Sequence, residues 1–171
     1  VTKANGTLTV NKKSVAVSWG STTSFTYNGN AQAPTASVTT GVSGETMTVN
    51  RTTGTNANSY TSTATCASVS GGQASCNNYT LTDTTKAFTI GKKAVTVTAS
   101  SNSKTYNGTA LTQTSGCASS SGLVSGHTAT CTNSGTITNA GSTTNTLSTV
   151  VIKNGSGTDV TSNYTVTKAN G

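Results

Sequence analysis

The sequence predicts an all-β protein made of two small β-sandwiches in tandem. Three observations lead to this fold class: the composition, runs that alternate apolar and polar residues, and landmarks that recur along the chain. Among 171 residues are 41 Thr and 24 Ser, only one is Pro, and 31% are hydrophobic. Disordered chains are rich in Pro and charged residues, whereas 8% of this chain is charged. Thr is β-branched and suits the exposed face of a strand, so the composition favours sheets over helices and disorder.

Strands are visible as short runs in which every second residue is apolar, as expected when one face of an antiparallel sheet is buried. These runs are 7–10, 14–19, 46–49, 86–90 and 94–98. Turn-forming pairs separate them, at Asn28-Gly29, Gly71-Gly72, Asn107-Gly108 and Asn154-Gly155. Strands at this spacing in units of roughly 80 residues are typical of small sandwiches.

Landmarks recur in the same order in the two halves of the chain, which predicts two homologous domains. Lys12–Val17 matches Lys92–Val97, and Tyr27-Asn28-Gly29 matches Tyr106-Asn107-Gly108. Three further pairs follow: Val42–Thr46 with Val124–Thr128, Asn56-Ala57 with Asn139-Ala140, and Asn78–Thr82 with Asn163–Thr167. We therefore expect domain A at 12–91 and domain B at 92–171.

The first six residues, Val1–Gly6, are identical to the last six, Val166–Gly171. The simplest interpretation is a tandem array of which the chain holds one period and a short overlap. Residues 1–11 then correspond to the last strand of a preceding B-type domain, with Thr7, Leu8, Thr9 and Val10 as the inter-unit strand. Domain B would in turn lack its own last strand, which the next unit supplies.

The four cysteines fall two in each domain. Their spacing predicts one disulfide in each, Cys66–Cys76 and Cys117–Cys131, and disulfides indicate an oxidising, extracellular compartment. A zinc site is the competing interpretation, but no Cys-x-x-Cys pair is present and His127 is the only histidine.

The chain resembles the MBG/YDG group of bacterial immunoglobulin-like repeats in four features taken together: the lysine pairs, Thr-Tyr-Asn-Gly-x-Ala, Val-Ser-Gly-x-Thr and Asn-Tyr-Thr-[Leu/Val]-Thr. The resemblance covers nearly the whole chain. It implies immunoglobulin-like domains of a long secreted or surface protein, with a role in a stalk or adhesin. The chain departs from the usual pattern in having cysteines, and Asn where the group often has Asp in the Tyr-Asp-Gly turn.

The residues that carry chemistry are few, and we expect no enzyme, cofactor or metal site. Glu45, Asp83 and Asp159 are the only acids, and they do not align between the domains, whereas a glycosidase needs two facing carboxylates. The sequence predicts Glu45 as a solvent-facing turn residue. An internal Lys–Asn isopeptide bond, which would need a buried acid near Lys13 or Lys93, is the less favoured alternative to the disulfides.

The net charge of +7 is spread thinly along the chain. It forms no basic stripe with aromatic platforms, so we expect no nucleic-acid partner, and no apolar run predicts insertion in a membrane. The favoured partners are identical neighbouring repeats joined head to tail. The predicted function is a structural unit of an extracellular bacterial fibre or adhesin stalk. The alternative is a module that binds glycans or another polymer of a host or neighbouring cell surface.

Overall fold

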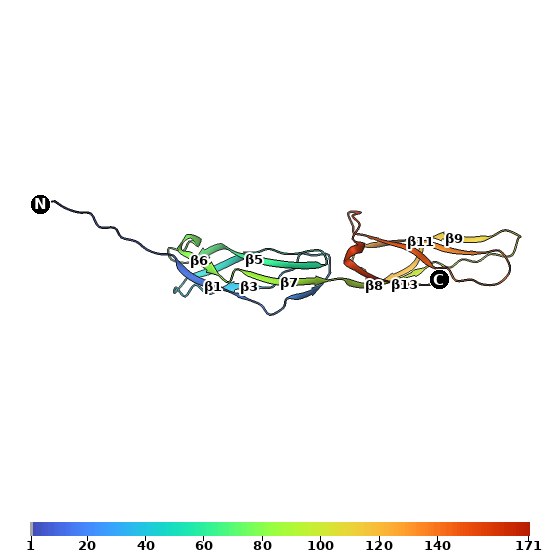
Figure 1. The fold of residues 1–171 in the computed structure, drawn as a ribbon, viewed down its shortest axis with the longest axis horizontal. Coiled ribbons are helices and arrows are strands. Elements are labelled where there is room, and N and C mark those ends of the chain that lie inside the picture. The colour runs from blue at the N-terminus through green and yellow to red at the C-terminus, as the bar shows by residue number, and fades with distance from the viewer. Residues whose placement is uncertain (1) are drawn as a thin grey trace. The chain divides into compact units, whose positions relative to one another are not determined.

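The computed structural model describes residues 2–171, so Val1 of the predicted inter-unit segment lies outside the described residues. It contains thirteen strands and two short 3-10 turns (Figure 1). Along residues 2–171 no α-helix occurs, which confirms the all-β prediction.

The chain divides into two compact units. Unit 1 comprises the residues up to 25 together with 31–54 and 59–89, and unit 2 comprises 26–30, 55–58 and 90–171. The predicted boundary between residues 91 and 92 follows the sequence repeat alone. Two short segments from the first half of the chain belong to unit 2, because their side chains pack there, as described below.

Most of unit 1 is a sheet of seven strands in the order β2-β7-β5-β4-β3-β1-β6. The bounds are β1 (Lys13–Trp19), β2 (Ser24–Thr26), β3 (Ala36–Val38), β4 (Thr46–Arg51), β5 (Asn58–Ser70), η1 (Cys76–Asn78), β6 (Tyr79–Thr82) and β7 (Thr85–Gly91). The long strand β5 pairs with β4 through its second half, from Ala64 to Ser70, and also lies beside β7.

The core of unit 1 is formed by the inward residues of these strands. Val15, Met47 and Tyr79 make a buried cluster, against which Val38, Val49, Cys66, Val69 and Leu81 pack. Along β1 only Val15 and Val17 are buried, with exposed residues on either side, as period-two alternation predicts.

Unit 2 contains two three-stranded sheets, β10-β8-β13 and β12-β11-β9, which face each other. The bounds are β8 (Lys93–Ala99), β9 (Leu111–Ser115), β10 (Cys117–Ser121), β11 (Thr128–Ile137), β12 (Leu147–Lys153), η2 (Thr161–Asn163) and β13 (Tyr164–Ala169). Val97 and Ile152 are fully buried between them, and each contributes about 1.5–3 kcal/mol by leaving water.

The first strand of each unit has a parallel neighbour, which differs from the antiparallel expectation. β1 pairs with β6 and β8 with β13 in parallel, with Lys13 opposite Tyr79 and Lys93 opposite Tyr164. Alternation of apolar residues reports which face of a strand is buried and says nothing about its direction. The parallel pairing arises because the rest of each unit lies between the two strands and returns the chain to the same end.

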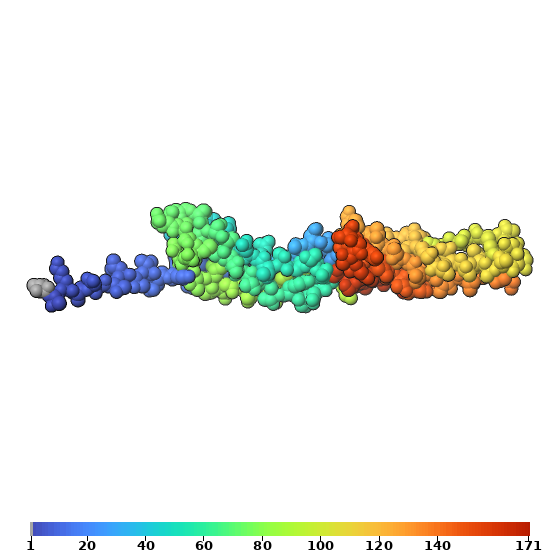
Figure 2. Space-filling model, turned by 90° about the horizontal axis from the view of Figure 1, so that it is seen from above, coloured from blue at the N-terminus to red at the C-terminus, as the bar shows by residue number. Residues whose placement is uncertain are grey.

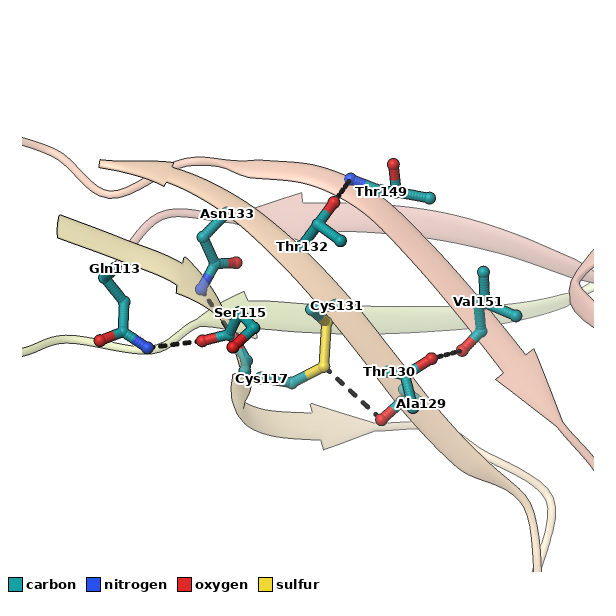
Figure 3. Close-up of a disulfide and its surroundings, with 11 residues drawn as sticks. Gln113, Ser115, Cys117, Ala129, Thr130, Cys131, Thr132, Asn133, Thr149 and Val151 are labelled. Atoms are coloured by element: carbon teal, nitrogen blue, oxygen red, sulfur yellow. Dashed lines mark hydrogen bonds between the residues drawn. A yellow bond between two sulfur atoms is a disulfide. The ribbon is translucent and has the colours of Figure 1, made fainter. Parts of the chain in front are cut away.

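Both predicted disulfides are present. Cys66 in β5 is bonded to Cys76 at the start of η1, with Cα atoms 5.9 Å apart. Cys117 and Cys131, with Cα atoms 5.4 Å apart, join β10 to β11 and thus connect the two sheets of unit 2 (Figure 3). The sulfur of Cys117 lies 3.6 Å from the Ala129 carbonyl oxygen, a van der Waals contact because an oxidised sulfur carries no proton.

We expect replacement of Cys117 and Cys131 by Ala to lower the free energy of unfolding of unit 2 by about 3 kcal/mol, because the bridge closes a loop of about 15 residues. Amide hydrogen exchange of β8, β11 and β12 measures the loss. The matched double variant of Cys66 and Cys76 should instead weaken unit 1, read from the fluorescence of Trp19, the only tryptophan. Equal destabilisation of both units by either variant would contradict this assignment.

Candidate site for a neighbouring strand

The predicted inter-unit segment is unpaired in the structure. Residues 2–11 have no regular secondary structure, and Figure 2 shows them as a thin extended chain of atoms. The side chains of Leu8 and Val10 are 101% and 99% exposed. The strand predicted over Thr7–Val10 is therefore not formed here. A strand needs a neighbour for its backbone N–H and C=O groups, and no strand of the described residues 2–171 pairs with this segment.

Strand β7 has the same sequence pattern as residues 7–10 and is paired with neighbouring strands. Counting back from the Lys-Lys pairs aligns Phe88 with Leu8 and Ile90 with Val10. Phe88 and Ile90 are only 3% and 2% exposed. The ring of Phe88 stacks on Tyr60, with centroids 5.3 Å apart, and meets Phe25 edge to face at 5.9 Å. In β7 the two apolar positions thus face the core.

Backbone hydrogen bonds define how β7 is held on its two sides. On the β5 side, Ala64 N–H donates to the Thr84 carbonyl at 2.8 Å. On the β2 side, Thr89 N–H donates to the Thr23 carbonyl at 2.8 Å, and Tyr27 N–H donates to the Gly91 carbonyl at 2.9 Å. This spacing of bonds is that of parallel strands, so residues 23–27, which include β2, run in the same direction as β7.

Unit 2 contains the segments that correspond to the two neighbours of β7, but it contains no strand that corresponds to β7 itself. Residues 141–146 correspond to the first half of β5, and 101–106 to the β2 region; neither is a strand. At the start of the gap, Gly171 N–H donates to the Asn145 carbonyl at 3.0 Å, and Asn145 N–H donates back to the Gly171 carbonyl at 3.4 Å. This pair occupies the position that Lys86 and Ser62 hold in unit 1.

The space between these two segments is a groove of about 440 Å³. Its apolar side chains include Leu111 and Ile137, both half-buried, and Tyr106, which is 63% exposed. Polar residues line the rest, namely Ser101, Asn102, Ser103, Lys104, Gln113, Thr136, Thr138, Asn139, Ser142, Thr143 and Asn145, together with Gly135, Ala140, Gly141 and Gly171.

Asn145 holds the wall of the groove in place. Its side chain is buried, with Nδ2 donating to the Ser100 carbonyl at 2.6 Å and Oδ1 accepting from Gly135 N–H at 2.9 Å. These bonds join residues 141–146 to β11 and to the end of β8. The groove is therefore built from segments that the fold positions without any occupant.

A second feature of unit 2 is a buried aromatic cluster around the first Tyr-Asn-Gly turn. Tyr27, 3% exposed, packs edge to face on Tyr164 at 5.4 Å and lies 6.1 Å from the ring of His127. The Tyr164 hydroxyl is hydrogen-bonded to His127 Nδ1 at 2.7 Å and accepts from Val124 N–H at 3.1 Å. Burial raises the pKa of the Tyr164 hydroxyl.

Asn163, directly before that tyrosine, fixes the second short segment of the unit. Its Oδ1 accepts from Ala57 N–H at 2.8 Å, and its Nδ2 donates to Asn56 Oδ1 at 3.0 Å. The packing of Tyr27 and these bonds explain why residues 26–30 and 55–58 belong to unit 2.

The corresponding positions in unit 1 are Tyr79 and Glu45. The Tyr79 hydroxyl donates to Glu45 Oε2, and this bond is the main reason why the pKa of Tyr79 is raised. Glu45 closes a turn, with its N–H donating to the Val42 carbonyl at 3.2 Å, as predicted, but its side chain is half-buried and bonded to Tyr79 and does not face solvent freely. The sequence missed the bond because its partners are 34 residues apart. Tyr106, the counterpart of Tyr27, is exposed at the groove.

No group of three or more His, Cys, Asp or Glu side chains within residues 2–171 could hold a metal ion. None of the helices described is long and apolar enough to cross a membrane.

Comparisons with protein-family models, with curated proteins and with solved structures found no match. The resemblance to MBG/YDG repeats therefore stays a prediction.

Alkaline pH should destabilise unit 1 through Tyr79. Its pKa in the folded chain lies above the ordinary value of 10.0, so stability is complete below pH 10 and is lost as pH rises through the raised pKa. Denaturant unfolding followed by Trp19 fluorescence between about pH 8 and pH 12 measures this. Tyr79→Phe should flatten the decline, and Glu45→Gln should reduce it because the charged acceptor is removed. Tyr164→Phe is the control and should leave the Trp19 transition unchanged.

Proposed function

We propose that the chain is a structural repeat unit of an extracellular bacterial fibre or adhesin stalk, assembled head to tail. The observation that carries the proposal is the contrast between Leu8 and Val10, almost fully exposed, and their counterparts Phe88 and Ile90, buried in β7. Exposed apolar residues in a strand pattern, together with a groove at the matching position of unit 2, favour a role in joining units.

The disulfides fit a load-bearing role outside the cell. Cys66–Cys76 spans 10 residues and Cys117–Cys131 spans 14, and both are intramolecular. Under tension a closed loop adds no length, whereas each residue of a reduced loop could extend by about 3.5 Å. Extracellular conditions keep such bonds oxidised.

The chemistry-bearing side chains are engaged in structure, which favours a non-enzymatic role. Glu45 accepts from Tyr79, and the His127 ring is bonded to Tyr164. Asp159 accepts from Thr161 N–H at 2.9 Å, and the Thr161 bonds lower the pKa of its carboxyl. A hydrolase would need such groups to face a substrate together.

The alternative function is binding of a glycan or another surface polymer. Exposed Tyr106 beside Lys104 and Gln113 is the observation in its favour, because a tyrosine ring can stack on a sugar. However, Lys104 Nζ is occupied by Asn107 Oδ1 at 3.0 Å and by the Thr109 carbonyl at 2.6 Å. Backbone edges and apolar side chains in the groove fit a strand better than a sugar.

A covalent two-period chain tests the structural function. In it, Gly171 of the first period continues directly into Thr7 of the second. At a concentration where the two-period chain is monomeric, we expect amides of residues 7–11 of the second period to be protected from hydrogen exchange, as in a paired strand, while the same residues of the first period exchange freely. The first period provides the internal control. Equal, fast exchange of both segments would show that the periods do not join through this strand.

Glycan-array binding tests the alternative function, a module that binds glycans. We expect the two-period chain and its Tyr106→Ala variant to give the same background signal. Specific binding to one glycan class, lost in the Tyr106→Ala variant while the fold is retained, would replace the structural proposal with the binding module.

A further inference from the structure

We infer that the groove of unit 2 is an acceptor site for residues 7–11 of a second copy of this chain, which add as a strand between residues 101–106 and 141–146. The inference rests on the proposed head-to-tail function and extends it to a defined binding site, occupant and register. The occupant follows from the sequence: these residues are the counterpart of β7, the strand that lies between the corresponding segments of unit 1.

The existing hydrogen bonds set the register of the added strand. Asn145 and Gly171 exchange both of their backbone bonds, and the donor residue that corresponds to Gly171 is Gly6. Antiparallel pairing alternates, so the next pair of this kind places Leu8 of the donor opposite Thr143, and the one after places Val10 opposite Gly141. This repeats in unit 2 the alignment that stacks Phe88 on Tyr60 in unit 1.

The other edge of the donor strand meets the segment that corresponds to β2. In unit 1, Thr89 donates to Thr23 and Tyr27 donates to Gly91. The equivalent bonds in the acceptor run from the donor's Thr9 N–H to the Asn102 carbonyl and from Tyr106 N–H to the donor's Asn11 carbonyl. Both Asn102 and Tyr106 line the groove.

The apolar faces also match. Residues 88 and 90 of β7 are buried, while 87, 89 and 91 are exposed, so the donor's Leu8 and Val10 face inward and Thr7 and Thr9 face solvent. Inside the groove, Leu111 and Ile137 offer the apolar surface. Two exposed apolar side chains on one partner thus meet two half-buried ones on the other.

A second contact is expected where the donor's unit 1 follows the added strand. Tyr27 in unit 2 is buried against Tyr164, whose counterpart is Tyr79. Tyr106 of the acceptor, now 63% exposed, should pack in the same way on Tyr79 of the donor, beside Glu45. The donor's residues 1–6 stay outside the sheet, because the acceptor's own residues 166–171 hold the corresponding positions.

Association of the full chain tests the inference. Light scattering coupled to size exclusion, from about 1 µM to about 1 mM, should show a mass that rises above the monomer with concentration. The Leu8→Asp, Val10→Asp double variant should associate at least about 100-fold more weakly, since two charges would be buried. Thr7→Asp with Thr9→Asp is the matched control: the same charge on the solvent face should leave association within about threefold of wild type.

Two deletions distinguish the role of residues 7–11 from that of the residues before them. The side chains of residues 2–11 are exposed, so removing 1–5 or 1–11 should leave the Trp19 unfolding transition unchanged. Removal of 1–5 should preserve association, and removal of 1–11 should abolish it. Loss of association on removing 1–5 alone would overturn the assignment of residues 7–11 as the occupant.

Cross-linking tests the register. A Thr9→Cys chain mixed with a Ser142→Cys chain should form an intermolecular disulfide, because these positions face each other on the same side of the sheet. Thr9→Cys mixed with Thr143→Cys, displaced by one residue, should not cross-link beyond background. A chain that stays monomeric to about 1 mM and gives no Thr9–Ser142 cross-link overturns the acceptor site. The two-period exchange experiment would still decide the head-to-tail function separately.

Discussion

The structure depends on keeping water away from the two apolar side chains of β7. In β7, which lies between β2 and β5 in the sheet, these are the buried residues Phe88 and Ile90. A chain with 31% hydrophobic residues has few side chains with which to exclude water, so each inward position contributes a large share of the core. Leu8 and Val10, which carry the same pattern, are almost fully exposed within the described residues 2–171. The proposed contact with the groove of unit 2 would cover them.

The two units use a common strand frame with different local solutions. The first strand pairs in parallel with the strand that follows a 3-10 turn, β1 with β6 and β8 with β13. A tyrosine begins that returning strand in each unit, and its hydroxyl is bonded to Glu45 in one and His127 in the other. The disulfides occupy different places, since one ties β5 to the turn before β6 and the other joins two sheets. A frame that tolerates such exchanges is suited to repetition, where stability comes from each unit and its neighbours.

The groove differs from an ordinary surface hollow because a pair of backbone hydrogen bonds lies at one end of it. Gly171 and Asn145 already form the first rung of a ladder, and the buried side chain of Asn145 holds that rung on β11 and β8. A small ligand could use the exposed ring of Tyr106, but it would not extend the backbone pairing that Asn145 and Gly171 begin. An added strand would extend that pairing, which is why we propose a polypeptide occupant.

Local sequence determined the parts of this protein whose physics is local. Period-two alternation predicted β1, β4, β7 and β8, short spacing predicted both disulfides, and matching landmarks aligned Leu8 and Val10 with Phe88 and Ile90. Only the tertiary structure decided the parallel direction of β6 and β13, the Glu45–Tyr79 bond, and the absence of a strand over residues 7–10. Each of these depends on a partner far away in the chain or outside it. A strand exists only where another edge is present to pair with it, and alternation shows a readiness to pair without showing where that edge lies.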